Sequence, residues 1–271
     1  MVSRFVRAVG MLIGAMAAIA SHSGAAEPLR IYAAGSLTAA FTDKIREFPA
    51  APETVAPPVF GPSGVLRDKI EHGEPADLLA SADMGQPRTL ARARPGRLVV
   101  MFTRNRLCAL SRAKIGLTQD NILDKLLDPA VRLATSTPRA DPAGDYTWAV
   151  FSRAEAVHPG AQAILEAKAM QLVGGPNSQP LLPGRGAVQG VFLTDRADVM
   201  LGYCSSAGPV VREMPELTSV ALPNSLTVGP AYGLIVLSDH LLAAQFALFV
   251  LSERGQAILL QHGFDPTGVA Q

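Results

Sequence analysis

The sequence carries few charges and few aromatic residues, and its net charge is close to zero. Charged residues make up 17% of the 271 positions, aromatic residues make up 6%, and the formal net charge is +1. Proteins that bind nucleic acid normally present a basic face, so this balance argues against a nucleic-acid partner. The hydrophobic share of 48% still allows a sizeable core, and we expect a globular chain.

Long apolar runs are missing beyond the N-terminal segment. A membrane helix needs roughly 18 to 20 apolar residues in succession. The best candidates, residues 232–237 and 241–251, are separated by the polar residues Ser238, Asp239 and His240. We therefore expect the mature chain to be soluble.

The N-terminal segment has the pattern of a secretory signal peptide. Arg4 and Arg7 precede an apolar stretch over residues 9–20, and small residues then lead to Ala26. We expect residues 1–26 to be removed by cleavage near Ala26, which predicts a periplasmic location in a host with two membranes. A first core helix is the alternative interpretation.

Cysteine and histidine are too sparse to suggest a metal site. The two cysteines, Cys108 and Cys204, lie in apolar runs, and the five histidines are scattered without pairing. An oxidising compartment permits a disulfide between the cysteines, but the sequence does not set their distance, and two buried thiols are equally compatible with it. No cofactor is expected.

After residue 26, short apolar runs alternate with amphipathic ones. Strands are predicted over residues 29–34, 55–60, 76–81 and 98–103, with helices over 38–48 and 64–72. The pattern then restarts, with strands over 106–110, 131–136, 198–204 and 227–237, and helices over 121–127, 146–156, 161–172, 187–196 and 241–261. This alternation predicts an α/β fold with mainly parallel sheets flanked by helices.

Typical domain sizes favour two lobes for a mature chain of this length. We expect lobe 1 to comprise residues 27–103 together with 226–271, and lobe 2 to comprise residues 104–225.

Small or hydroxyl residues, usually beside glycine, stand directly before a helical run at four places. A helix N-terminus attracts anions through its unpaired N–H groups, and glycine allows close approach of a ligand. Each serine taken alone is more typical of a helix cap than of a ligand site, and Asp141 and Asp145 are compatible with ordinary first-turn acids. The four places are residues 35–38, 61–64, 141–144 and 184–187.

Several of these segments, in order, resemble periplasmic molybdate-binding proteins, the solute receptors of ABC importers. Residues 33–38 (AAGSLT) and 60–66 (FGPSGVL) resemble the first two anion-binding loops of that family, and residues 73–83 (GEPADLLASAD) resemble its Gly-x-Pro-Ala-Asp signature. Residues 141–146 and 198–203 are similar to its inter-strand turn and to the strand that carries a ligand-binding tyrosine. The similarity spans nearly the whole mature chain.

The resemblance implies a type II periplasmic-binding fold, with a ligand cleft between two hinged lobes. It implies molybdate or tungstate as the ligand, the membrane permease of an ABC importer as the partner, and a monomeric protein. Serine hydroxyls, backbone N–H groups and one phenol would bind the oxyanion, and molybdenum would be bound only in that form. The implied ligand-binding residues are Ser36, Ser63, Ala143, Arg185, Gly186 and Tyr203.

Departures from the family pattern leave the ligand open. Pro62 stands where the family often has serine, and Arg185 places a guanidinium near the expected anion site. That guanidinium either binds the anion through forked hydrogen bonds or points to solvent. Sulfate, a phosphonate or a carboxylate is the alternative ligand, and a ligand-sensing adaptor is the alternative role.

The sequence does not indicate an enzyme. Catalysis would require a nucleophile beside a base, paired carboxylates or a metal cluster. Ser63 is not in a nucleophile elbow, and His72 lies roughly two and a half turns further along the same predicted helix.

Overall fold

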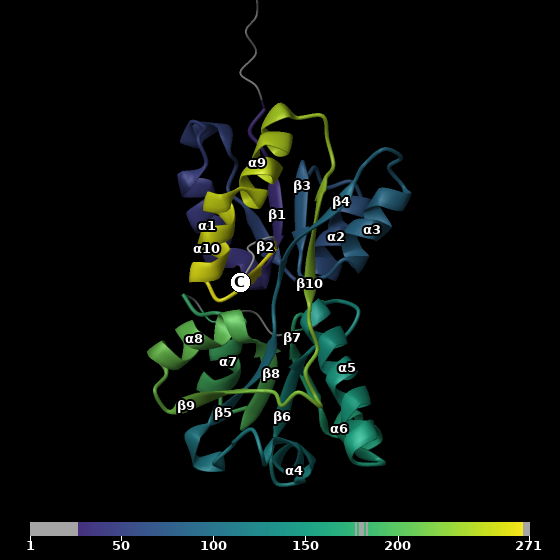
Figure 1. Cartoon of the computed structure of the whole chain (residues 1–271), viewed down its shortest axis with the longest axis vertical. Helices are drawn as coiled ribbons and strands as arrows, with labels where there is room; N and C mark the ends of the chain where they lie inside the picture. Colours follow the sequence, from purple (N-terminus) through teal and green to yellow (C-terminus); the bar gives the residue numbers. More distant parts are fainter. Residues whose placement is uncertain (1–26, 177, 179–181, 183, 268–271) are drawn as a thin grey trace, which may run out of the picture.

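The computed structural model describes residues 27–176, 178, 182 and 184–267. The chain forms two lobes stacked along its long axis, each with helices packed around a sheet (Figure 1), and the prediction of a two-lobed α/β fold is confirmed. The expected signal peptide, residues 1–26, lies outside the described residues. Among the described residues, none of the helices combines the length and the hydrophobicity that a membrane span requires.

Lobe 1 contains a six-stranded sheet in the order β11-β4-β10-β3-β1-β2. Its strands are β1 (Ile31–Ala34), β2 (Val59–Gly61), β3 (Leu78–Ser81), β4 (Val99–Arg104), β10 (Ala231–Val236) and β11 (Asp265–Pro266). Its helices are α1 (Thr38–Glu47), α2 (Ser63–Glu71), α3 (Gly85–Arg92), α9 (Leu241–Leu251) and α10 (Glu253–Gln261).

Both faces of the lobe 1 sheet are covered. Successive strand residues point to opposite faces, and all of β1 is buried. Ile31 and Ala33 share a cluster with Phe41 of α1, whereas Tyr32 packs with Leu66 of α2. Helices α1, α9 and α10 therefore cover one face, and α2 and α3 cover the other (Figure 1).

Lobe 2 contains a five-stranded sheet in the order β7-β6-β8-β5-β9. Its strands are β5 (Leu107–Arg112), β6 (Leu133–Ser136), β7 (Met170–Val173), β8 (Val199–Tyr203) and β9 (Leu217–Ala221). Its helices are α4 (Ile122–Leu127), α5 (Pro142–Val157), α6 (Ala161–Lys168), α7 (Ala187–Leu193) and α8 (Cys204–Glu213). The buried residues of α4, α5 and α6 join one core cluster and those of α7 and α8 join another, so these two groups of helices cover opposite faces.

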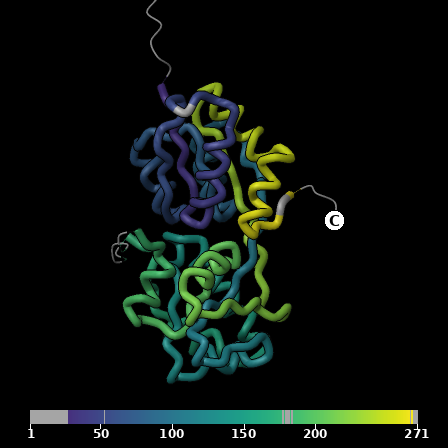
Figure 2. The backbone as a smooth tube through the Cα atoms, turned by 90° about the vertical axis from the view of Figure 1, so that its left-hand side faces the viewer, coloured from purple at the N-terminus to yellow at the C-terminus, as the bar shows by residue number. Residues whose placement is uncertain are grey.

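The chain passes between the two sheets twice. It leaves β4 at Arg104 and enters β5 at Leu107, and it returns between Ala221 and Ala231. The two passes lie side by side (Figure 2), and the N–H of Asn105 donates to the carbonyl of Pro230 at 2.9 Å. The lobe limits predicted from the sequence stay a prediction.

The sheets are mixed rather than mainly parallel, chiefly because each contains one strand that arrives from the other lobe; in lobe 1 the short strand β11 also pairs antiparallel with β4. In lobe 1, β1 to β4 run in one direction, and β10 is inserted antiparallel between β3 and β4. In lobe 2, β6 to β9 share a direction, and β5 is inserted antiparallel between β8 and β9. In each lobe, the strand that arrives from the other lobe runs against its neighbours.

Two predicted helices differ most from the structure. The helix expected over residues 161–172 ends at Lys168, and its remainder forms strand β7 beside β6. The helix expected over 241–261 is two helices, α9 and α10, because the backbone is extended at Ser252 and the side chain of that residue caps α10.

The two cysteines, whose state the sequence left open, form a disulfide. Cys108 on β5 and Cys204 at the start of α8 have their Cα atoms 5.0 Å apart. Cys204 directly follows Tyr203, the last residue of β8. The bond therefore joins the end of β8 to the strand that enters lobe 2.

Candidate functional site

A cavity of about 690 Å³ lies between the lobes. Lobe 1 contributes the end of β1 with the start of α1, the end of β2 and Ala82. Lobe 2 contributes the ends of β6, β7 and β8 and the starts of α5, α7 and α8. No lysine or arginine is among the described residues that line the cavity. The ionisable side chains in the lining include those of His262 and Asp141. An anion bound there would be held mainly by neutral groups and helix N-termini.

Ser36 lies at this cavity, on the short 3₁₀ turn Gly35–Leu37 between β1 and α1. Its Oγ is 2.9 Å from the hydroxyl of Tyr232. Tyr232 is fully buried on β10, and its hydroxyl also accepts a hydrogen bond from Asn105 Nδ2 at 3.1 Å. The position of the Ser36 side chain is therefore set by a buried network.

Tyr203, at the end of β8 in lobe 2, lines the same cavity, and its ring packs edge-on against that of Tyr232 with the centroids 5.6 Å apart. It is 6% exposed, and its hydroxyl has no hydrogen-bond partner among the described residues. Burial raises the pKa of Tyr203 well above its usual value, so the phenol stays protonated. A buried donor without a partner is unfavourable, and this hydroxyl lies beneath the cavity surface rather than on it.

Ser63 borders the site without lining the cavity. Its Oγ is buried at the start of α2 and accepts the N–H of Ala82 at 3.1 Å, which leaves the hydroxyl proton available. The preceding residue, Pro62, lines the cavity instead. Next to Ser63, the N–H of Gly64 donates to the carbonyl of Ala140 at 3.0 Å, so the lobes are in contact at this point.

Ala143 lines the cavity, but its N–H is already engaged. Asp141 caps α5, accepting the N–H of Ala143 at 3.1 Å on Oδ1 and the hydroxyl of Ser136 at 2.6 Å on Oδ2. Burial raises the pKa of Asp141, and the nearby carboxylates of Asp145 and Asp83 act in the same direction. Asp141 itself lines the cavity. The sequence showed Asp141 as a first-turn acid but not that it competes for this amide.

Gly186 and Arg185 are adjacent in the chain, but they differ in their position relative to the cavity. Gly186 precedes α7 and lines the cavity. The side chain of Arg185 is 50% exposed, and its Nη1 lies 3.7 Å from Glu213 Oε2. Arg185 is not among the lining residues of the cavity. Of the six predicted site residues, the structure thus brings Ser36, Ala143, Gly186 and Tyr203 to one cavity, with Ser63 at its border.

Three residues near the cavity were not singled out from the sequence: Tyr232, Asn105 and Ser205. Ser205 lines the cavity from the first turn of α8, a helix that the sequence analysis did not predict. Asn105 and Tyr232 approach each other only because both passes of the chain meet between the lobes. No local sequence signal indicated that meeting.

Comparison with known proteins gives a family and a set of related structures. Residues 29–265 match the family model described as bacterial extracellular solute-binding protein. An uncharacterized protein of Pasteurella multocida is 37% identical over 88% of this chain and 98% of its own length. A molybdate-binding protein of Mycobacterium tuberculosis H37Rv is 28% identical over 94% of each chain. In the same organism, the solved structure of a sulfate-binding protein has a TM-score of 0.72 and 20% identity, covering 90% of this chain and 88% of that one.

Proposed function

Because the chain belongs to the bacterial extracellular solute-binding proteins, we propose that it captures a small oxyanion, molybdate or tungstate, for the membrane permease of an ABC importer. One observation carries the proposal: Ser36 and Tyr203, from opposite lobes, line one cavity whose described lining holds no lysine or arginine. The molybdate-binding relative points to the same ligand class.

Neutral donors suit a fully ionised oxyanion that has lost its water. Each oxygen of such an ion can accept several hydrogen bonds, and charge-assisted hydrogen bonds are the strong ones. Ser36 and Tyr203 would donate through hydroxyls, and Ser63 has a hydroxyl proton free at the border of the cavity. Ala143 and Gly186 would contribute backbone N–H groups at helix starts, provided that Asp141 releases the amide of Ala143.

Capture would couple to movement of the lobes. A ligand that contacts both Ser36 in lobe 1 and Tyr203 in lobe 2 has its highest affinity for the arrangement of the lobes in which both residues face it. The equilibrium then shifts toward that arrangement by the difference in affinity. A permease that recognises the ligand-bound arrangement would receive only loaded protein.

A second candidate ligand is an anion that carries its own proton, such as hydrogenphosphate or a phosphonate. Asp141 places a carboxyl group on the cavity wall, and the charged groups that most influence it, Asp145 and Asp83, are also acidic. A carboxylate repels a fully deprotonated dianion but accepts a hydrogen bond from a protonated one. The same carboxyl, when protonated, is compatible with molybdate.

Isothermal titration with molybdate, tungstate, sulfate and phosphate in parallel tests the proposal. We expect tight binding of molybdate and tungstate, weaker binding of sulfate, and a loss of roughly 10-fold or more for Ser36→Ala, for Tyr203→Phe and for the Ser36→Ala/Ser63→Ala pair, because each removes a hydrogen bond to a charged group. Ser225→Ala, at an exposed position between the lobes, is the matched control. Absence of binding for all four anions would overturn the oxyanion assignment.

Asp141→Asn separates the two candidate ligands. If the ligand is molybdate, removing the negative charge should leave its affinity unchanged or raise it. If phosphate binds best to the unaltered protein and Asp141→Asn reverses the preference toward molybdate and sulfate, the second candidate is correct.

A further inference from the structure

Asn105 lies between the last residue of β4 and the first of β5, where the chain passes from lobe 1 to lobe 2. Its side chain is 2% exposed. Oδ1 accepts the N–H of Arg106 at 2.8 Å, which fixes the orientation of the amide group. Nδ2 then points its two protons at two oxygens, the Tyr232 hydroxyl at 3.1 Å and Ser205 Oγ at 2.8 Å.

The Ser36–Tyr232 hydrogen bond can run in either direction, because each hydroxyl can donate or accept. In the direction that we infer, Tyr232 accepts from Asn105 and donates its own proton to Ser36 Oγ, 2.9 Å away. Ser36 then accepts that proton and retains its own for another acceptor. Ser205 likewise accepts from Asn105 and retains its own proton. Both serines line the cavity.

We propose that Asn105 is a positioning residue that directs the hydroxyl protons of Ser36 and Ser205 into the cavity, and that Ser205 is a further donor to the bound oxyanion. The inference rests on the proposed function in that the ligand is an anion. The single buried side-chain amide of Asn105 thus orients hydroxyl donors on both lobes. Ser205 joins Tyr203, whose buried hydroxyl has no partner among the described residues, on the lobe 2 side of the cavity.

This arrangement depends on the relative position of the lobes. Ser36 and Tyr232 belong to lobe 1, whereas Ser205 belongs to the first turn of α8 in lobe 2. Asn105 holds both hydrogen bonds only when α8 and β10 are at their present separation. The amide therefore orders the donors in the same arrangement in which the ligand contacts both lobes.

Neutron diffraction from the deuterated, unliganded protein tests the proton directions without any ligand. The proposal expects the deuteron of Tyr232 between its oxygen and Ser36, and the deuterons of Ser36 and Ser205 pointing into the cavity. A Ser36 deuteron directed at Tyr232, or a Ser205 deuteron directed away from the cavity, would overturn it. This result is independent of which anion binds, so it is distinguishable from failure of the proposed function.

Calorimetry with molybdate tests the consequence for binding. Ser205→Ala should weaken binding about 10-fold or more, the effect expected for a hydrogen bond to a charged group. Asn105→Ala should weaken it at least as much, and Asn105→Asp should do the same because a carboxylate cannot donate. Asn224→Ala, an exposed amide in the other connection, is the matched control and should bind as the unaltered protein does.

A variant series separates positioning from a general structural role. In a Ser36→Ala/Ser205→Ala background, the further change Asn105→Ala should cost little affinity, because the two hydroxyls through which it acts are already absent. An equal loss in both backgrounds would show that Asn105 acts by another route, and unchanged affinity in Ser205→Ala would refute the assignment of that serine. If molybdate does not bind the unaltered protein, the proposed function fails and the deuteron positions alone decide this inference.

Discussion

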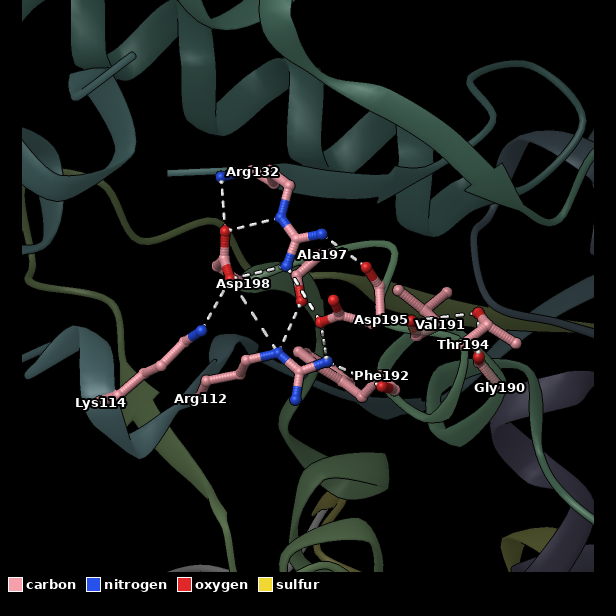
Figure 3. Close-up of polar contacts among 10 residues, drawn as sticks. All are labelled: Arg112, Lys114, Arg132, Gly190, Val191, Phe192, Thr194, Asp195, Ala197 and Asp198. Atoms are coloured by element: carbon pink, nitrogen blue, oxygen red, sulfur yellow. Dashed lines mark hydrogen bonds and ion pairs between the residues drawn. The ribbon is translucent and has the colours of Figure 1, made fainter. Parts of the chain in front are cut away.

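The guanidinium of Arg132 forms a bidentate ion pair with Asp198 in lobe 2 (Figure 3). The Nε–Oδ2 and Nη2–Oδ1 distances are both 2.9 Å. The two residues stand immediately before the parallel neighbours β6 and β8. The N–H of Arg132 also donates to Asp198 Oδ2 at 3.1 Å. Together these bonds fix the start of β8, the strand that ends at Tyr203, against the start of β6.

Asp198→Asn should destabilise lobe 2 by about 2 kcal/mol at pH 7. The hydrogen bonds from Arg132 lower the pKa of Asp198 from 3.8 to about 2, so its contribution is complete above pH 3.8 and is lost as the pH falls toward 2. Urea denaturation at pH 7 and at acidic pH measures the difference, which should shrink on acidification. Asp239→Asn is the matched control, because Asp239 also pairs with an arginine but is 96% exposed, and its loss should cost at most about 0.5 kcal/mol.

Burial of Lys44 predicts that the free energy of unfolding rises with pH. It is fully buried on α1, where its Nζ donates to the carbonyl of Gly255, and burial lowers the pKa of Lys44 from 10.5 to about 7. Between these two pH values the unfolded chain binds a proton that the folded chain does not, so the free energy of unfolding should increase by up to about 1.4 kcal/mol per pH unit. Denaturation from pH 7 to pH 10 measures this slope. Lys44→Met should remove it and Lys125→Met should not; equal slopes in both variants would contradict the assignment.

Removal of the Cys108–Cys204 disulfide should destabilise the protein by about 3 kcal/mol. The bond links residues separated by 96 positions, and closing a long loop restricts the unfolded chain. A Cys108→Ser/Cys204→Ser protein compared with the oxidised protein in urea measures the cost. Alkylation under denaturing, non-reducing conditions checks the bond itself, and labelling of either cysteine would refute it.

Gly64→Ala should hinder contact between the lobes. A Cβ on this residue would lie 2.5 Å from the carbonyl oxygen of Arg139 and 2.7 Å from that of Ala140, both backbone atoms of lobe 2. We expect weaker ligand binding, by about 10-fold or more, with little change in the unfolding of lobe 1, since α2 tolerates alanine well. Small-angle scattering with and without ligand would detect the larger separation. Gly85→Ala, at the start of α3 with only ordinary contacts to Asp83, is the control.

The parts of the fold that the sequence predicted are those set by local pattern. The strand over 29–34 and the helix over 38–48 appear as β1 and α1 because a buried run and an amphipathic run are separated by Gly35 and Ser36. Helix α8 was missed because Gly208 and Pro209 are typical of a turn, yet Pro209 is tolerated inside the helix. Strand β7 was missed because its residues continue the apolar run of α6 without a breaking residue.

In the candidate site, too, local sequence predicted some residues, whereas other contacts depend on the tertiary structure. Ser36 and Tyr203 were predicted by resemblance of the short segments that carry them, and the structure places both at the cavity. The engagement of the Ala143 amide by Asp141 depends on a side-chain rotamer, which no pattern encodes. The meeting of Asn105 with Tyr232 depends on residues 127 positions apart. Such contacts follow from how the two lobes are joined.

The paired connection between the lobes has a mechanical consequence. Because the two passes run side by side and are linked by the hydrogen bond from Asn105 to Pro230, we expect the lobes to move mainly by bending across them, since twisting or sliding would break that bond. The relative position of the lobes would then be described by one angle between them. Ligand binding would change that angle, and a partner that contacts the outer ends of both lobes could detect the change.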